Sequence, residues 1–298
     1  MVKKKVTIVT HSGNFHADEI FAVAVLFLVL EKDNDISVVR SRDMEIIEKA
    51  DYVLDVGRIY DESKNRFDHH QSGGAGKRDN GIPYASFGLI WKVYGKKLCG
   101  NYEVALRIDK ILIQPIDAVD NGIQFVETKI EGVYPYVIGD FFDAFKPSWK
   151  ESSENKDKIF INMVSYAKNL LQREIIKNND KLEAQSIVEK IYNESEDKRL
   201  IILDTYLPHD EVLSKFPEPL FVIFPRDNSY WAIQTIRNDR NSFIDRKSLP
   251  ESWAGKIGEE LEKITGVTGA VFCHNGRFMA VNKTKEGILQ MAKIALGN

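Results

Sequence analysis

Short β-branched segments alternate with apolar or amphipathic segments through the first part of the chain. Residues 5–10 predict a strand, and the apolar run 20–30 predicts a buried helix because acidic residues at its start suit a helix N-terminus. The same patterns predict strands at 37–40 and 51–57, with a helix at 43–50 between them. Alternating strands and helices favour a mostly parallel sheet flanked by helices, which binds ligands beyond the carboxyl ends of its strands.

A hairpin-like connection at 58–67 leads toward a glycine-rich segment at 71–81, which we expect to form a mobile loop that covers the site as a lid. Helical spacing then predicts helices at 82–94 and 104–121. A third helical pattern, at 153–193, predicts one long or broken helix.

The charge-rich stretch 193–199 marks the expected domain boundary, because the pattern changes after it. Strands are predicted at 200–203, 220–225, 230–237, 269–274 and 277–281, and helices at 253–264 and 284–296. The chain therefore reads as a first domain of residues 1–195 and a second, smaller α/β domain of residues 196–298.

The composition indicates a chain that can bury a hydrophobic core without disulfide bonds. Of its 298 residues 43% are hydrophobic and 29% charged, and the formal net charge is -3. That balance excludes a strongly basic chain, although a metal site or a local basic patch could still attract a nucleic acid. Cys99 and Cys273 show no CxxC or zinc-finger spacing and are expected to be reduced. With no signal, transit or membrane-spanning segment in view, we expect a cytoplasmic protein with no membrane contact.

Histidine is concentrated near acidic residues. Of the 6 histidines in the chain, His11, His16, His69 and His70 fall within the first 70 residues. Four clusters of acidic residues and histidine stand out: residues 11–19, Asp55, the triplet Asp68-His69-His70, and residues 117–122. Because the predicted strands end at His11 and Asp55, we expect the clusters to converge at one edge of the sheet.

A two-metal site needs roughly six to eight protein ligands, with metal ions about 3.5–4 Å apart. Six candidates fill this need: His11, His16, Asp18, Asp55, His69 and Asp120. Asp55 is a carboxylate that could bridge the two ions. Mixed histidine and aspartate ligation suits Mn²⁺, with Mg²⁺ or Co²⁺ as alternatives, and the lack of cysteine argues against a closed zinc site.

Several of these residues also have structural interpretations. Glu19 is better explained as a charge at a helix N-terminus. Asp117 fits a helix-end charge, and between it and Asp120 we expect Asp120 to be the ligand. Asp55 is harder to explain structurally, because a buried carboxylate needs a partner.

The ordered set His11, His16, Asp18, Asp55, Asp68-His69-His70 and Asp120 resembles the DHH phosphoesterase superfamily. Within it, residues 10–19, 67–71 and 117–122 are similar to the melanocyte proliferating gene exonuclease family, as are residues 147–149, 231–234 and 272–278. The resemblance implies a DHH-type phosphoesterase domain followed by a DHH-associated substrate-binding domain. It departs from the usual first motif at His16, which stands one residue after the position of an expected aspartate, so an imidazole replaces a carboxylate there.

The C-terminal part offers candidate substrate contacts. The turn Asn275-Gly276-Arg277 occupies the region of a glycine-containing substrate turn, with a plain hairpin turn as the alternative. Further candidates for phosphate are Arg226, Arg237, Arg240 and Arg246, and candidates for base stacking are Trp231 and Trp253.

These features predict metal-dependent phosphodiester hydrolysis, and the resemblance implies a 3′–5′ exonuclease acting on RNA or a short oligonucleotide. Asp55 would hold the metals, His70 would contact the substrate phosphate or protonate the leaving group, and Asp68 would orient a histidine. One alternative is hydrolysis of pyrophosphate or a nucleotide phosphomonoester, which the slightly acidic chain favours. Another is a binding protein with a relict site. A homodimer is one assembly that the sequence allows.

Overall fold

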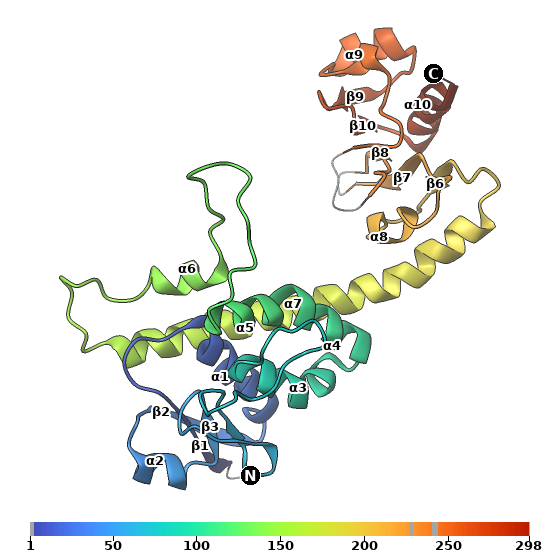
Figure 1. The fold of residues 1–298 in the computed structure, drawn as a ribbon. Coiled ribbons are helices and arrows are strands. Elements are labelled where there is room, and N and C mark those ends of the chain that lie inside the picture. The colour runs from blue at the N-terminus through green and yellow to red at the C-terminus, as the bar shows by residue number, and fades with distance from the viewer. Residues whose placement is uncertain (1–2, 227–228, 240–243, 298) are drawn as a thin grey trace. The chain divides into compact units, whose positions relative to one another are not determined.

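Two sheets carry the fold, one in each half of the chain (Figure 1). The computed structural model describes residues 3–226, 229–239 and 244–297. The chain divides into a first unit, Met1–Asn179, and a second unit, Asp180–Asn298. The division falls inside α7 (Lys156–Glu194), because the last turns of this helix pack on the second sheet through Val188 and Tyr192. Each unit combines a five-stranded sheet with helices, so the chain is a mixed α/β protein.

The first unit builds its sheet from short strands near the N-terminus. Its elements are β1 (Lys4–Thr10), α1 (Ala17–Leu30), β2 (Asn34–Arg40), α2 (Met44–Lys49), β3 (Tyr52–Leu54), β4 (Tyr60–Asp61), η1 (Glu62–Lys64), β5 (Arg66–Phe67), α3 (Ser86–Cys99), α4 (Tyr102–Ile108), η2 (Asp109–Ile113), α5 (Gln114–Asp120), α6 (Ile138–Asp143) and the N-terminal part of α7. The strand order is β2-β1-β3-β5-β4.

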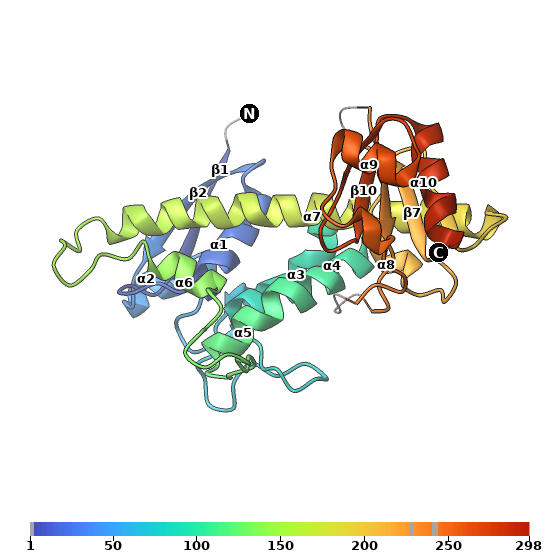
Figure 2. The ribbon, with the colours of Figure 1, turned by 90° about the horizontal axis from the view of Figure 1, so that it is seen from above.

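Pairing in this sheet is parallel between β1 and β2, β1 and β3, and β3 and β5, and antiparallel between β4 and β5. Val9 of β1 stands opposite Val53 of β3, and both pack with Ile47 of α2. Figure 1 shows α1 on the other side of the sheet from α2. Helix α1 is buried continuously from Asp18 to Leu26, as its apolar run predicts. Figure 2 follows the start of α7 past α1, where Phe160 packs edge-on against Phe15.

Three predicted elements of the first unit have different limits in the structure, for identifiable reasons. The strand 51–57 stops at Leu54, because Asp55 takes a left-handed backbone with φ 54°. The helix predicted at 82–94 runs from Ser86 to Cys99, since Pro83 precedes it and Asp18 accepts its first amides. The helix predicted at 104–121 divides into α4, a π-helical turn η2 and α5. Pro115 opens α5 and cannot donate a main-chain bond. Helix α6 was not predicted.

The second unit is a sheet covered on both faces. Its further elements are β6 (Leu200–Ile202), α8 (Asp210–Leu213), β7 (Phe221–Pro225), β8 (Trp231–Thr235), η3 (Glu251–Trp253), α9 (Gly258–Thr265), β9 (Ala270–Cys273), β10 (Met279–Asn282) and α10 (Lys285–Gly297). The strand order is β6-β7-β8-β10-β9, with β6 parallel to β7 and the remaining pairs antiparallel.

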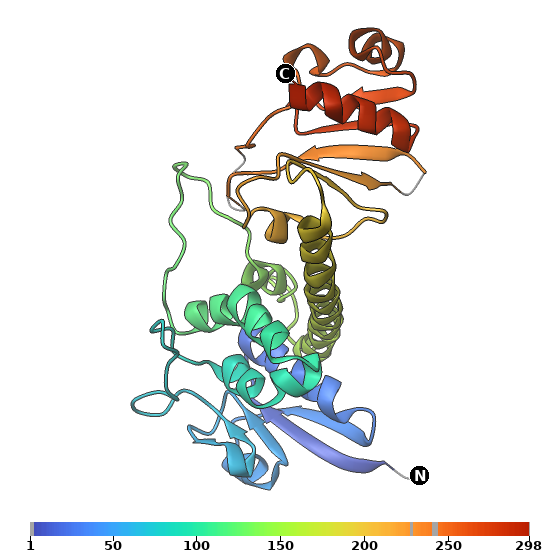
Figure 3. The same cartoon turned by 90° about the vertical axis from the view of Figure 1, so that its right-hand side faces the viewer.

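Alternation along β7 shows how this sheet is buried. Phe221 and Ile223 pack against α9 and α10 on one face, and Val222 packs against α7 and α8 on the other. Figure 3 shows α10 lying along the strands. The helix predicted at 253–264 is interrupted, because Gly255 adopts φ 69° between η3 and α9. Helix α8 was not predicted.

Two smaller expectations can also be compared with the structure. Cys99 and Cys273 are free and buried. No helix among the described residues combines the length and apolarity needed to cross a bilayer.

Candidate metal centre

The predicted ligands meet where neighbouring strands end. His11 follows β1, Asp55 follows β3 and His69 follows β5, and these three strands are adjacent and parallel. Parallel strands bring their carboxyl ends to the same edge of a sheet, so the three side chains converge. Helices supply the rest: His16 caps α1, Asp18 lies in its first turn, and Asp120 ends α5.

Asp55 is the centre of this arrangement. Its Oδ2 lies 3.3 Å from Nε2 of His11, and its Oδ1 lies 3.3 Å from Nε2 of His69. Asp55 is buried, and its left-handed backbone is uncommon for a residue other than glycine. A strained backbone at a buried carboxylate is characteristic of a functional site.

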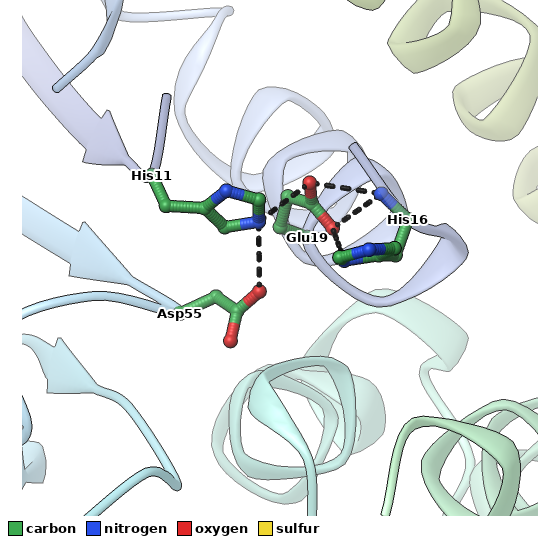
Figure 4. Close-up of side chains that lie close together, drawn as sticks. All are labelled: His11, His16, Glu19 and Asp55. Atoms are coloured by element: carbon green, nitrogen blue, oxygen red, sulfur yellow. Dashed lines mark hydrogen bonds and ion pairs between the residues drawn. The ribbon is translucent and has the colours of Figure 1, made fainter. Parts of the chain in front are cut away.

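One group of candidate ligands contains His11, His16, Glu19 and Asp55 (Figure 4). Glu19 Oε1 lies 3.0 Å from His11 Nε2, and Glu19 Oε2 lies 3.9 Å from Nδ1 of the half-exposed His16 side chain. The Glu19 carboxylate also accepts the main-chain N–H of His16 at 2.9 Å. The interpretation of Glu19 as a helix N-terminal charge is therefore confirmed but incomplete, because the same carboxylate contacts the candidate ligand His11.

A second group contains Asp18, Asp55, His69 and Asp120. His69 Nε2 lies 2.9 Å from Asp120 Oδ2. Both groups use Asp55, which could therefore be shared between two cations.

Main-chain N–H groups at the start of α3 hold the Asp18 carboxylate of the second group in place. Asp18 accepts from the main-chain N–H groups of Ser86 and Phe87 at 3.0 and 2.7 Å, and Asp117 accepts from the next amide, Gly88, at 3.1 Å. Burial, with the charges of Asp120 and Asp55, raises the pKa of Asp18. A bound cation would relieve this cost of burying negative charge.

Asp117 and Asp120 have different partners. Asp117 is fully buried and pairs with Arg78 at 2.7 Å, and Arg78 also pairs with Asp109 at 2.7 Å. Burial raises the pKa of Asp117 to about 7 although Arg78 lowers it. Asp117 belongs to none of the candidate metal groups of the described chain. Arg78 belongs to the glycine-rich segment 71–81, so the loop predicted to be a lid is tied to η2 and α5.

A third group contains Asp55, His69 and His70. His70 Nδ1 lies 2.8 Å from Asp68 Oδ1 and 3.3 Å from Asp55 Oδ1. Asp68 also accepts the main-chain N–H of His70 at 3.0 Å. Contact with Asp68 raises the pKa of His70. This geometry fits Asp68 as the residue that orients His70, whose side chain is 56% exposed.

The pKa shifts of the cluster residues indicate that the cluster favours positive charge. Burial lowers the pKa of His11, but contacts with Asp55 and Glu19 outweigh burial and raise it to about 10. Burial also lowers the pKa of His69, but contacts with Asp120 and Asp55 outweigh burial and raise that pKa to about 11. Burial raises the pKa of Asp55, yet its two histidines hold that pKa well below its usual range. Protons on the imidazoles thus occupy positions that a metal ion could take.

The buried polar atoms of the cluster fit a divalent cation. Among the described residues, Nε2 of His11, Nε2 of His69 and Oδ1 of Asp55 are buried without a partner in hydrogen-bonding geometry. Buried polar atoms ordinarily have such partners. Imidazole nitrogens and carboxylate oxygens directed at one another are the ligands of intermediate and hard divalent cations. These clusters could hold a metal ion.

A cavity of about 1020 Å³ opens beside the cluster. Its polar lining includes His11, His16, Asp18, Asp55, Asp68, His70 and Asp120, together with Arg42 and Arg58. Its other wall is apolar and comes from η2, α5 and residues 125–138. Residues 71–81 are not among the residues that line it.

The second unit holds the predicted substrate contacts, which lie in two places. The turn Asn275-Gly276-Arg277 connects β9 to β10, and Gly276 donates its N–H to His274 Nδ1 at 2.9 Å. Arg246 donates to the main-chain oxygens of Ser214 and Pro219 at 2.9 and 3.1 Å.

The remaining candidates in this unit have limited support. Trp231 is half-buried against its sheet and Trp253 is buried in the core, which leaves little of Trp253 for stacking. Arg240 lies outside the described residues. Arg226 and Arg237 belong to the described chain, on strand ends of the same sheet.

Sequence reasoning missed the roles of Glu19, Arg78 and the apolar cavity wall. The signal for Glu19 was its position next to Asp18, because adjacent carboxylates in a helical turn point in different directions and contact different partners. No local signal pairs Arg78 with Asp117, because that contact joins distant segments. The residues of the apolar cavity wall fit an ordinary helical pattern, so their spacing did not indicate a binding surface.

Comparisons with known proteins cover nearly the whole chain. A family model named MYG1_exonuc, described as "Uncharacterised protein family (UPF0160)", matches residues 7–296. The MYG1 protein of Dictyostelium discoideum is 35% identical, over 96% of this chain and 95% of that protein. The MYG1 exonuclease of Homo sapiens is 29% identical, over 96% of this chain and 85% of that protein. The corresponding MYG1 protein of Chlamydia pneumoniae is 31% identical, over 96% and 95%.

Proposed function

We propose that this chain, which belongs to the MYG1 exonuclease family, is a metal-dependent phosphodiester hydrolase that removes nucleotides from the 3′ end of RNA or short oligonucleotides. The name of the human relative, MYG1 exonuclease, supports nuclease activity. The order of the ligand clusters supports a place in the DHH phosphoesterase superfamily, with the first unit as the hydrolytic domain and the second as the substrate-binding domain.

The observation that carries the proposal is the position of Asp55 between two histidines. One oxygen faces His11 and the other faces His69, each at 3.3 Å. A carboxylate shared by two ligand groups is what a two-metal hydrolase requires. His11, His16, Glu19 and Asp55 would hold one Mn²⁺, and Asp18, Asp55, His69 and Asp120 would hold another.

Bound divalent cations would supply a water of lowered pKa as nucleophile and stabilise charge on the phosphoryl oxygens. The chain's own residues do the positioning. Asp68 accepts from His70 Nδ1, which leaves Nε2 of that imidazole to donate to a phosphoryl oxygen or to the leaving oxygen. Contact with Asp68 raises the pKa of His70, which favours the protonated imidazole that this transfer needs.

In the second unit we propose that Arg277 contacts the substrate, since its guanidinium makes only a long bond of 3.5 Å to the main-chain oxygen of Leu249. The Gly276 N–H and the terminal nitrogens of Arg246 have shorter bonds to protein partners. Arg277 lies on an exposed turn with a left-handed backbone, φ 59°. A guanidinium on such a turn could hold a phosphate.

A substrate panel with added Mn²⁺ tests the function. The wild-type protein should shorten a 5′-labelled RNA oligomer one nucleotide at a time and leave pyrophosphate intact. The Asp55→Asn variant should lose this activity by at least about 10³-fold while keeping its thermal unfolding midpoint within a few degrees. Turnover of pyrophosphate or adenosine bisphosphate without turnover of RNA would replace the nuclease with the smaller-substrate hydrolase.

A further inference from the structure

One wall of the cavity beside the candidate metal ligands is apolar and exposed. Ile111, Pro115 and Val119 line it at four-residue spacing along η2 and α5, and Phe125 follows on the next segment. Ile111 is 53% exposed, Val119 56% and Phe125 48%. Residues at this spacing share one face of a helix, so they form a continuous strip.

This strip adjoins the proposed chemistry. Val119 immediately precedes Asp120, whose carboxylate contacts His69. Arg42 and Arg58 line the same cavity. One cavity therefore combines a ligand cluster for cations, two guanidinium groups and an apolar surface.

The cavity is also too large for a phosphate alone. Pockets for small ligands usually span about 300–1,000 Å³, and this one holds about 1020 Å³. Exposed apolar side chains gathered in a pocket mark a binding surface for an apolar or aromatic group. A flat ring attached to a phosphate would match both walls of the cavity.

We propose that this apolar strip, formed by Ile111, Pro115, Val119 and Phe125, binds a nucleobase of the strand being hydrolysed. The proposal rests on the proposed nuclease function. The phosphodiester lies on the metal ligands, Arg42 and Arg58 take neighbouring phosphate charge, and the base of the terminal nucleotide lies against the strip. Because every base has an apolar face, this contact selects for the presence of a base and discriminates little between bases.

Charge complementarity favours this occupant over a protein segment. Two arginines and a cluster suited to divalent cations share the cavity with the strip. A nucleotide carries the negative charge that these groups attract, together with the ring that the strip would cover. Pyrophosphate has the charge but no apolar face, so it leaves the strip exposed.

The test compares two short RNA oligomers, one intact and one with abasic residues at its last two 3′ positions, on wild type, Ile111→Ala and Phe125→Ala. Ile176→Ala is the matched control, because Ile176 is an exposed helical isoleucine, 46% exposed, that does not line the cavity. Wild type should show a KM about ten-fold higher for the abasic oligomer. Phe125→Ala and Ile111→Ala should raise KM for the intact oligomer several-fold and leave the abasic KM and the unfolding midpoint unchanged.

The outcomes separate the two proposals. Failure of wild type to cut either oligomer overturns the nuclease function itself. Hydrolysis of both oligomers with equal KM, or variants that match Ile176→Ala, overturns the base-binding strip alone. A variant that slows both oligomers equally shows that the strip acts independently of the base. A variant that changes the mass measured by light scattering shows that a second copy of the chain covers the strip. Either result overturns the inference.

Discussion

His69 Nε2 lies 2.9 Å from Oδ2 of Asp120, and this contact joins the end of α5 to the strand edge that carries the other ligands. Three residues earlier in the same helix, Asp117 faces Arg78 and the amide of Gly88. Two carboxylates of one helix thus serve different purposes. Asp117 anchors the helix, and Asp120 presents an oxygen to the candidate ligand His69.

Substitution of these two aspartates should have different effects on cation binding. Asp120→Asn removes a carboxylate from the group around His69 and should weaken Mn²⁺ binding by about 100-fold or more, because even an outer partner of a ligand costs about 10–100-fold. Asp117→Asn should keep the wild-type affinity and stoichiometry in isothermal titration calorimetry. Loss of a bound ion in Asp117→Asn with normal binding in Asp120→Asn would reverse the assignment.

Gly88 should tolerate no side chain. A Cβ at this position would stand 1.9 Å from Asp117 Oδ2 and 2.8 Å from its Cγ, and both atoms belong to a buried, paired carboxylate. Gly88→Ala should therefore lower the free energy of unfolding by about 1–3 kcal/mol, measured by chemical denaturation.

Gly139→Ala is the control for that substitution. Gly139 lies in α6, and a Cβ there meets nothing within 4 Å. It should leave stability unchanged or increase it by up to about 1 kcal/mol. Equal losses in both variants would mean that the Asp117 contact does not constrain α3.

Cation affinity should rise with pH. The pKa of His11 is raised to about 10 and that of His69 to about 11, whereas a metal ligand must be an unprotonated imidazole. Mn²⁺ must displace these protons at neutral pH, so its apparent affinity should increase about ten-fold per pH unit for each proton released. Calorimetry in two buffers of different ionisation enthalpy should detect that release, and a pH-independent affinity would contradict it.

The same protons affect the metal-free fold with a definite sign. A histidine whose folded pKa exceeds its unfolded value contributes stability that is complete below about pH 6.5 and is lost as the pH rises through the folded value. The metal-free protein should therefore lose stability toward pH 10, as followed by thermal unfolding. Saturating Mn²⁺ should reduce this loss, because the cation replaces the protons.

Arg246 and Arg277, both in the second unit, should respond differently when their charge is removed. Arg246→Gln breaks bonds to the main-chain oxygens of Ser214 and Pro219 and should destabilise the protein by about 2 kcal/mol. Arg277→Gln should leave the unfolding midpoint unchanged and raise KM for RNA about ten-fold. The interpretation fails if Arg277→Gln unfolds at lower temperature with unaltered KM.

Local patterns predicted the elements that depend on local properties. The apolar run at 20–30 forms most of α1, and the pattern at 153–193 forms the unbroken helix α7. The connection at 58–67 contains the antiparallel pair β4 and β5. Each of these depends on side-chain type at fixed spacing, which is visible in one chain.

Boundaries failed where distant residues decide them. Helix α3 begins at Ser86 because Asp18, far away in the sequence, accepts its first amides. The domain boundary expected at 193–199 stays a prediction. The two units divide inside α7, where Val188 and Tyr192 pack on the second sheet.

The sequence by itself identified His11, Asp55, His69 and Asp120 as candidate metal ligands, since their types and order are visible in one chain, but it did not identify Glu19. Only the tertiary structure decided which oxygen faces which nitrogen. It placed Asp55 between two histidines, turned Asp117 toward Arg78, and left Ile111 and Val119 exposed beside the cluster. The physical reason is that these contacts join elements far apart in the chain, and their geometry follows from packing against the sheet.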